Sequence, residues 1–379
     1  MQTLILEDLL KTLVSHQTVN PPGNELQLCE SLAHLLSDLG FETKIQNIAP
    51  NRGNIIAVAG SKNPQKSLML TGHLDVVGID DGWSSDPFTL TNKDSRYYGR
   101  GVCDMKGAIA AMILAAQKYV KQESLEQNQL ILAFVADEEV SGEGTRYLLQ
   151  SGIVADCAVI GEPTQMNVCV AHRGVDRYKV TIYGEAGHAS KPKNESNPLY
   201  VAANLLLGIE TQQSILALKS HPVLPPPSIT ATIVNGGVQG NAIPETCSVI
   251  VDRRTIPGED HRFVLNEANG IINSVLKKYP LCHTDISSIA WIPPTEPLKN
   301  SPLQHIAYKV LKDMHIPSEI TYFPAGCDQY QFINHGIDTV LIGPGSLAQA
   351  HTTNEYIEVN QLEEAAEFYF RLMQTILFV

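Results

Sequence analysis

The first part of the chain alternates short apolar runs with stretches in which apolar residues recur at helical spacing. Runs such as 54–60 and 129–136 are short, continuous and bounded by glycine or charged residues, which is typical of buried strands. Residues 107–120 and 144–152 instead place apolar side chains three and four positions apart, which predicts helices. Strands that alternate with helices predict an α/β fold with a mixed sheet and helices on both faces.

The pattern changes near residue 176. Beyond it, 247–255 alternates apolar and polar residues, as half-buried strands do, and 261–279 has helical periodicity. Past residue 289 the chain returns to helix and strand units like those of the first part. We therefore expect a catalytic domain in two parts, residues 1–175 and 289–379. A smaller α+β domain, residues 176–288, is inserted between them.

Composition and charge narrow the class of protein. The chain has 27 basic and 40 acidic residues, a formal charge of −13, which argues against a nucleic-acid surface and against binding to anionic membranes. Its 7 cysteines are scattered and contain no C-x-x-C pair, which is typical of a reducing compartment. Residues 1–16 lack a basic stretch and predict an amphipathic first helix rather than a signal peptide, and no apolar run could span a bilayer. We expect a soluble cytoplasmic protein with no nucleic-acid or membrane partner.

A histidine and an aspartate interrupt the apolar run 67–77. Side chains two residues apart in a strand point to the same side, so His73 and Asp75 share one face near the end of the strand. The Asp75 carboxylate could accept an imidazole N–H, which would fix the tautomer of His73 and make its other nitrogen a better metal ligand. The alternative is a hydrogen-bonded histidine at a sheet edge without a metal.

Two further segments place carboxylates near the ends of predicted elements. Asp104 lies in a glycine-flanked turn before the helix predicted at 107–120, where it could instead accept N–H bonds from the helix start. Glu138 and Glu139 follow the apolar run 129–136, next to a third carboxylate. Adjacent carboxylates repel one another unless they fan into water or a cation holds some of them.

The same arrangement recurs later in the chain. Glu162 directly follows the apolar run 157–161, and His351 lies in a loop after the run 338–342. In open α/β sheets, sites assemble at the carboxyl ends of the strands, so we expect these segments to converge on one crevice.

The residue types indicate a metal site. Two histidines and several carboxylates, with no cysteine at fitting spacing, match zinc, cobalt or manganese better than a structural zinc knuckle. There are more ligands than one tetrahedral ion needs, which suggests two ions with a bridging carboxylate. The sequence contains no nucleophile elbow, phosphate-binding loop or H-E-x-x-H helix. Cys103 is a conceivable nucleophile, but nothing predicts a base beside it, and a small buried thiol is the preferred interpretation.

Six motifs in order along nearly the whole chain carry a family resemblance. The sequence resembles the metal-dependent aminoacylase and carboxypeptidase family, which includes acetylornithine deacetylase and succinyl-diaminopimelate desuccinylase. The resemblance implies a zinc-peptidase α/β domain interrupted by a smaller lid domain, and a homodimer formed through that lid. The motifs are GHLDVV, GRGVCDMKGAIAAM, DEEVSG, GEPT, GEAGHAS and GPGSLAQAHTTNEY.

Carried over by position, the resemblance implies two divalent ions, zinc first and cobalt as the alternative. Asp104 would bridge them. One ion would be held by His73, Asp104 and Glu162, and the other by Asp104, Glu139 and His351.

The resemblance also implies catalytic roles. Asp75 would orient His73, and Glu138 would be the general base that takes a proton from water and returns it to the leaving amine. His188 of the lid motif would stabilise the oxyanion, commonly from the other protomer; without the resemblance it would be an exposed loop histidine.

Substrate contacts are implied at five positions. Arg173 and Asn241 look like the family's carboxylate and carbonyl contacts, and so does Arg253, for which the neighbouring Arg254 is an alternative. Gly345 and Ser346 would line the pocket. An arginine fork suits a substrate carboxylate.

The motifs AHRG and GPGSLAQAH look closer to acetylornithine and acetylcitrulline deacetylases than to the desuccinylase, whose usual arginine-arginine-glycine motif is His172-Arg173-Gly174 here. We therefore expect a two-metal amide hydrolase that deacetylates N-acetylornithine in arginine biosynthesis. The alternatives are N-acetylcitrulline, N-succinyl-diaminopimelate, another N-acyl amino acid or a dipeptide. An alternative of another class is a non-catalytic metal- or partner-binding relative.

Overall fold

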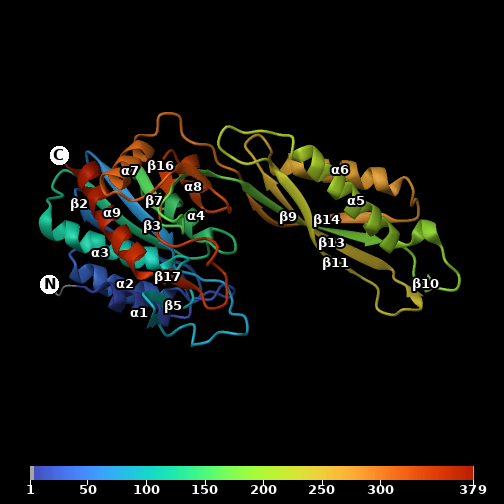
Figure 1. The fold of residues 1–379 in the computed structure, drawn as a ribbon, viewed down its shortest axis with the longest axis horizontal. Coiled ribbons are helices and arrows are strands. Elements are labelled where there is room, and N and C mark those ends of the chain that lie inside the picture. The colour runs from blue at the N-terminus through green and yellow to red at the C-terminus, as the bar shows by residue number, and fades with distance from the viewer. Residues whose placement is uncertain (1–3, 379) are drawn as a thin grey trace. The chain divides into compact units, whose positions relative to one another are not determined.

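The computed structural model describes residues 4–378, which form two compact units (Figure 1). Unit 1 extends to Val170 and resumes over Pro297–Phe323 and from Cys327 onwards. Unit 2 comprises Ala171–Glu296 and Pro324–Gly326. The domain boundaries predicted from the sequence, at 175/176 and 288/289, stay a prediction.

An eight-stranded mixed sheet forms the centre of unit 1. Four neighbouring strands, β6, β3, β7 and β16, run parallel. On one side β2 pairs antiparallel with β6 and β1 with β2, and on the other side β8 pairs antiparallel with β16. Every residue of β3 is buried, as expected of a parallel strand covered on both faces. In sheet order, the strands are β1 (Glu42–Ala49), β2 (Arg52–Gly60), β6 (Gln129–Val135), β3 (Ser67–His73), β7 (Cys157–Ile160), β16 (Asp338–Leu341), β8 (Val168–His172) and β15 (Ile320–Phe323).

Helices pack around this sheet. The helices of unit 1 are α1 (Leu6–Ser15), α2 (Leu26–Asp38), α3 (Lys106–Gln122), α4 (Glu143–Gln150), α7 (Pro302–Asp313), α8 (Gln329–Asn334) and α9 (Val359–Leu377). Helices α3 and α9 contact β3 and β6, while α2 and α4 contact β1 and β2. A small sheet of β17 (Tyr356–Glu358), β5 (Arg96–Tyr98) and β4 (Thr91–Lys93) completes unit 1. The expected α/β class with a mixed central sheet is confirmed.

Unit 2 is an antiparallel sheet with two helices (Figure 1). The sheet order is β11 (Ser228–Gly236), β13 (Thr246–Thr255), β9 (Gly174–Tyr183) and β14 (His283–Ile292). Alternate residues of β9 are buried, and its inward side chains pack with α5 (Pro198–Leu216) and α6 (His261–Leu276) in one core. A two-stranded sheet of β10 (Gly187–His188) and β12 (Ala242–Ile243) and a short 3-10 helix (Asn194–Ser196) lie in the same unit.

Both helices of unit 2 begin where their sequences carry start signals. The Asn197 side chain accepts the N–H of Leu199, with Pro198 at the first helical position. Asp260 caps α6 by accepting the N–H of Phe263. The helix predicted at 261–279 is therefore observed as α6, and its cap fixes its start at the first predicted residue.

All 7 cysteines are free and buried. Within residues 4–378, no helix is both long and apolar enough to cross a bilayer.

Candidate metal centre and active site

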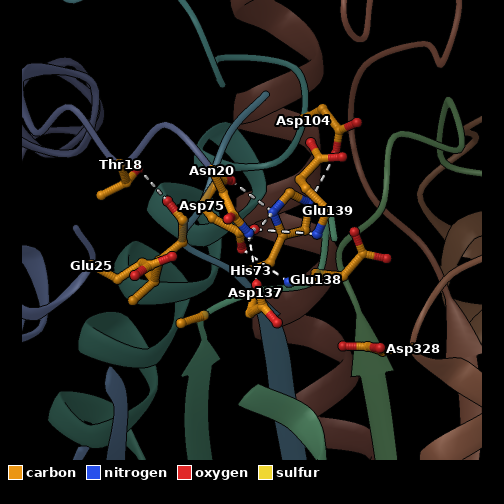
Figure 2. Close-up of polar contacts among 12 residues, drawn as sticks. Thr18, Asn20, Glu25, His73, Asp75, Asp104, Asp137, Glu138, Glu139 and Asp328 are labelled. Atoms are coloured by element: carbon orange, nitrogen blue, oxygen red, sulfur yellow. Dashed lines mark hydrogen bonds and ion pairs between the residues drawn. The ribbon is translucent and has the colours of Figure 1, made fainter. Parts of the chain in front are cut away.

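Three of the four parallel strands of unit 1, β3, β6 and β7, deliver polar side chains to one edge of the sheet. His73 is the last residue of β3, and Glu138 and Glu139 follow the end of β6 at Val135. Glu162 comes two residues after β7. Because parallel strands end at the same edge, these side chains meet there. Figure 2 shows His73, Glu138 and Glu139 close together.

Asp104 lies between two histidines. Its Oδ1 is 3.1 Å from Nε2 of His73, and its Oδ2 is 3.4 Å from Nε2 of His351. Nε2 of His351 also lies 3.1 Å from Oε1 of Glu139. Helix α3 begins at Lys106 without a side-chain cap, so the carboxylate of Asp104 faces the histidines instead of the helix start.

Two groups of side chains bring potential ligand atoms within 4.8 Å of one another: His73 with Asp104 and Glu139, and His73 with Glu138 and Glu162. The structure therefore assembles the predicted ligands and the predicted base in one cluster. It groups Glu162 with Glu138 and His73 rather than with Asp104. Imidazole and carboxylate donors in this number fit one or two divalent cations of the zinc, cobalt or manganese type.

Burial and mutual charge dominate the electrostatics of this cluster. Asp104 is 7% exposed and Glu162 4% exposed. Burial, and then the charge of Asp104, raises the pKa of Glu162 to about 8. Burial and the charge of Glu162 raise the pKa of Glu138 well above its usual range. Carboxylates placed so close together favour a bound cation, which would offset their repulsion.

The two histidines respond in the opposite direction. The hydrogen bonds with Asp104 and Glu139 raise the pKa of His351 to about 10. Burial alone would lower the pKa of His73, but the bond to Asp104 and the charges around it raise this pKa well above the usual value. The surrounding carboxylates therefore favour positive charge at both imidazoles, whether it comes from a proton or from a bound cation.

Asp75 supports the site differently from the sequence prediction. Nδ1 of His73 donates to the backbone carbonyl of Asp75 at 2.9 Å, whereas the carboxylate of Asp75 lies 3.7 Å away. That carboxylate instead accepts the backbone N–H groups of Glu138 and Glu139, both at 3.2 Å, and the side-chain amide of Asn20 at 2.9 Å. The imidazole hydrogen bond thus goes to the main chain of Asp75, the carboxylate remains within ion-pair distance of the ring, and the same carboxylate holds the turn that carries Glu138 and Glu139.

Sequence reasoning missed the residues behind this turn. The side-chain amide of Asn20 also donates to Asp137 (Figure 2). Oδ1 of Asp137 lies 2.7 Å from Nη1 of Arg52. Arg52 in turn pairs with the buried Glu25 at 2.6 Å. Asn20 and Glu25 lie far from the turn in sequence, and only the third carboxylate beside Glu138 hinted at a need for such partners.

The predicted pocket residues Gly345 and Ser346 lie in the loop between β16 and His351. Gly345 has a φ of +86°, and a Cβ there would approach the Sγ of Cys103 at 2.6 Å. The Cys103 thiol donates to the carbonyl of Ser346 at 3.3 Å, and burial raises its pKa well above the usual value. The preferred interpretation of Cys103 as a buried thiol agrees with this placement.

Unit 2 brings His188 and Asn241 together. Both are exposed, His188 pairs with Ala242 across β10 and β12, and the N–H of Ala189 donates to the carbonyl of Asn241 at 3.0 Å. Nδ1 of His188 is 2.7 Å from Oγ of Ser190. Both side chains are therefore available at the surface of this unit.

The three candidate arginines of unit 2 differ in exposure and in their partners. Arg253 is 0% exposed; its guanidinium lies 3.0 Å from both Glu259 and Glu267 and donates to the carbonyl of Arg254. Arg253 is therefore engaged inside the unit in this structure, and its contact with substrate stays a prediction. Arg254 is more exposed but pairs with Asp252 at 2.7 Å. Arg173 is half-buried, with Nη1 3.3 Å from the carbonyl of Pro226.

Comparisons with known proteins agree with this geometry. Residues 69–375 match the model of peptidase family M20/M25/M40. An acetylornithine deacetylase from Salmonella paratyphi B is 32% identical over 342 residues, which cover 89% of this chain and 87% of that relative. Among solved structures, a tripeptidase from Staphylococcus aureus superposes with a TM-score of 0.82 at 18% identity over 98% of both chains. A dinuclear metal binding peptidase of the M20 family from Bacillus subtilis gives a TM-score of 0.72 at 15% identity, over 98% of this chain and 97% of that one.

The family model spans most of the chain, and the cluster at the strand ends supplies metal-ligating side chains of the kind such enzymes need. This protein therefore belongs to peptidase family M20/M25/M40 and is a metal-dependent hydrolase.

Proposed function

We propose that the protein hydrolyses the amide bond of an N-acyl amino acid and that its substrate is N-acetylornithine. The observation that carries the proposal is the placement of Glu138 within the same buried cluster as His73 and Glu162, one residue from Glu139. A site that only bound metal would need the ligands but not an additional carboxylate beside them. The relation to acetylornithine deacetylases supports the choice of acyl amino acid.

We assign the ligands as the family resemblance implies. His73, Asp104 and Glu162 would hold one ion, and Asp104, Glu139 and His351 the other. The two carboxylate oxygens of Asp104, one directed at each histidine, support its assignment as the bridge. Zinc is the proposed metal and cobalt the alternative, because the set combines imidazoles with carboxylates.

Glu138 is the proposed general base. Two bound zinc ions would polarise the amide carbonyl and lower the pKa of the attacking water. An oxygen of the Glu138 carboxylate accepts the proton that the water loses and returns it to the leaving nitrogen. The carboxylate of Asp75 accepts the backbone N–H groups of Glu138 and Glu139 and so fixes the position of the base relative to the ligand.

Unit 2 supplies the remaining proposed contacts. His188 is proposed to stabilise the oxyanion, and Asn241 and Arg173 to bind the substrate carbonyl or carboxylate. Gly345 and Ser346 are proposed to line the pocket in unit 1.

A homodimer through unit 2 is also proposed. Strand β11 is an edge of its sheet, and two of its apolar side chains, Ile233 and Val234, are 47% and 52% exposed. An exposed apolar edge strand is a template for pairing with a second chain. Sedimentation of the wild type and of Val234→Lys tests this: a dimer that the substitution dissociates supports it, and a monomeric wild type contradicts it.

We place the reaction in the cytoplasm and in arginine biosynthesis. The free, buried cysteines agree with a reducing compartment.

The test is hydrolysis of a small panel, with zinc or cobalt added and again after chelation. The panel contains N-acetylornithine, N-acetylcitrulline, N-succinyl-diaminopimelate, N-acetylmethionine and a dipeptide. Metal-dependent turnover led by N-acetylornithine supports the proposal, and another leading substrate would keep the reaction and change the pathway. Metal binding without turnover on any of them would favour a non-catalytic relative.

A further inference from the structure

A buried carboxylate outside the ligand set lies beneath the loop that carries Asp104. Glu355 is 1% exposed, and each of its two oxygens has two donors. Oε1 accepts the backbone N–H groups of Cys103 at 2.8 Å and Asp104 at 3.1 Å. Oε2 accepts the N–H of Gly101 at 3.0 Å and Nη1 of the buried Arg100 at 2.8 Å.

These bonds matter because residues 101–105 form a turn with no helix or strand partners of their own. Buried backbone N–H groups are costly when they lack an acceptor. Gly101 has a φ of +84°, and a Cβ there would approach Val76 at 2.7 Å, so the turn has little room to rearrange. The Glu355 carboxylate thus satisfies three N–H groups that the turn itself cannot satisfy.

Glu355 also joins this turn to the loop that carries His351. It lies four residues after His351, and its backbone carbonyl accepts the N–H of Gly99 at 3.1 Å. Arg100 donates to the carbonyl of Thr352 at 3.3 Å as well as to Glu355. Hydrogen bonds therefore connect the segment before Asp104 directly to the segment after His351.

We propose that Glu355 is a positioning residue for the metal centre, which fixes the turn before Asp104 so that this carboxylate directs one oxygen to His73 and the other to His351. The inference rests on the proposed metal-dependent hydrolysis, since it concerns the bridging ligand of that site. A carboxylate is required because four donors converge on it, and an amide in its place would present N–H groups to some of these donors.

The first test compares Glu355→Gln with Glu358→Gln. Glu358 pairs with Arg96 at 2.8 Å on a partly exposed surface three residues further along, so it controls for losing a glutamate–arginine pair in the same segment. Cobalt affinity and the visible absorption spectrum of the cobalt-loaded protein are measured alongside activity and thermal stability.

We expect Glu355→Gln to bind cobalt about 10- to 100-fold more weakly and to change the spectrum, while Glu358→Gln resembles the wild type. Lower thermal stability with wild-type cobalt affinity and spectrum would show a merely structural role and overturn the inference. A wild type that binds two ions without hydrolysing the panel would contradict the proposed function and leave this comparison valid.

A second test needs no substitution, and it decides the matter if Glu355→Gln does not fold. Hydrogen exchange of the backbone amides of Gly101, Cys103 and Asp104 is followed in the wild-type protein with and without zinc. If Glu355 organises the turn, these amides are protected in both states. Protection that arises only with zinc would mean that the metal organises the turn, and would overturn the inference.

Discussion

Nδ1 of His73 donates to the backbone carbonyl of Asp75, while the carboxylate of the same aspartate accepts the N–H groups of Glu138 and Glu139. One residue therefore orients a histidine with its main chain and a neighbouring turn with its side chain. The two functions can be separated by substitution because only the second depends on the carboxylate.

Asp75→Asn should keep the tautomer of His73 and weaken the site through Glu139. The asparagine side chain has an NH2 group in place of one carboxylate oxygen. That group would face N–H donors whose hydrogen bonds the carboxylate now accepts, including the amide of Asn20. We expect metal affinity to fall about 10- to 100-fold. Nitrogen NMR of the histidine ring should still show a proton on Nδ1, and its loss would mean that the carboxylate sets the tautomer after all.

Glu138→Gln should abolish most turnover without emptying the site. Removing a general base typically costs about 100- to 10,000-fold in kcat, and the metal content should stay at the wild-type value. Glu143→Gln is the matched control, since Glu143 is partly exposed and pairs with Arg146 at the start of α4. If Glu138→Gln retained wild-type kcat, the assignment of the base would be wrong.

Metal removal should destabilise unit 1 selectively, because every proposed ligand belongs to that unit. A ligand at about 1,000 times its Kd stabilises the folded state by about 4 kcal/mol. Calorimetry with and without a chelator should therefore lower the unfolding temperature of one transition and leave that of unit 2 in place. An unchanged profile would contradict the assignment of the ligands to unit 1.

Arg253→Met should act on stability rather than on substrate affinity. Removing one partner of a buried ion pair typically costs about 3 to 5 kcal/mol, because the remaining charges, here Glu259 and Glu267, stay buried. Arg254→Met, nearer the surface, should cost less than about 1 kcal/mol. Urea unfolding measures both free energies, and a raised KM for Arg253→Met at unchanged stability would instead support the predicted role in substrate binding.

His172 should make unit 2 less stable as the pH falls. Burial lowers its pKa to about 4, and among residues 4–378 Nε2 has no hydrogen-bond partner, so a proton there would be unsatisfied. The unfolded chain takes up this proton near pH 6.5, so stability is lost between about pH 6.5 and pH 4, with an upper limit of about 3 kcal/mol. Urea unfolding of the wild type and of His172→Asn is measured at pH 7, 5.5 and 4.5. The free energy of unfolding should fall more in the wild type than in the variant, and equal decreases would contradict the prediction.

The sequence predicted those parts of the molecule that depend on local pattern. Helices such as α6 were found because a side-chain cap coincides with periodicity, and His73 and Glu162 were found because strand ends deliver them. Asp104 and His351 were also singled out by their positions near predicted elements, but the assignment of ligands to each ion came from the resemblance.

What the sequence could not predict are contacts between distant segments. Glu355 and Asn20 act through partners more than 50 residues away, and three of the bonds to Glu355 come from backbone N–H groups, which carry no sequence signal. The internal pairs of Arg253 with Glu259 and Glu267 were not predicted, because an arginine that binds a substrate carboxylate and one that pairs with internal glutamates look the same in a sequence.

Because every cysteine is buried, the rate of thiol modification reports on local unfolding. Burial raises the pKa of Cys157 and Cys169 to about 12, so an alkylating reagent should reach these sulfurs only when the surrounding strands separate. Cys247 and Cys282 report in the same way on unit 2. Mass spectrometry of a single labelling reaction could thus time the opening of each unit in the unmodified enzyme, with no introduced probe.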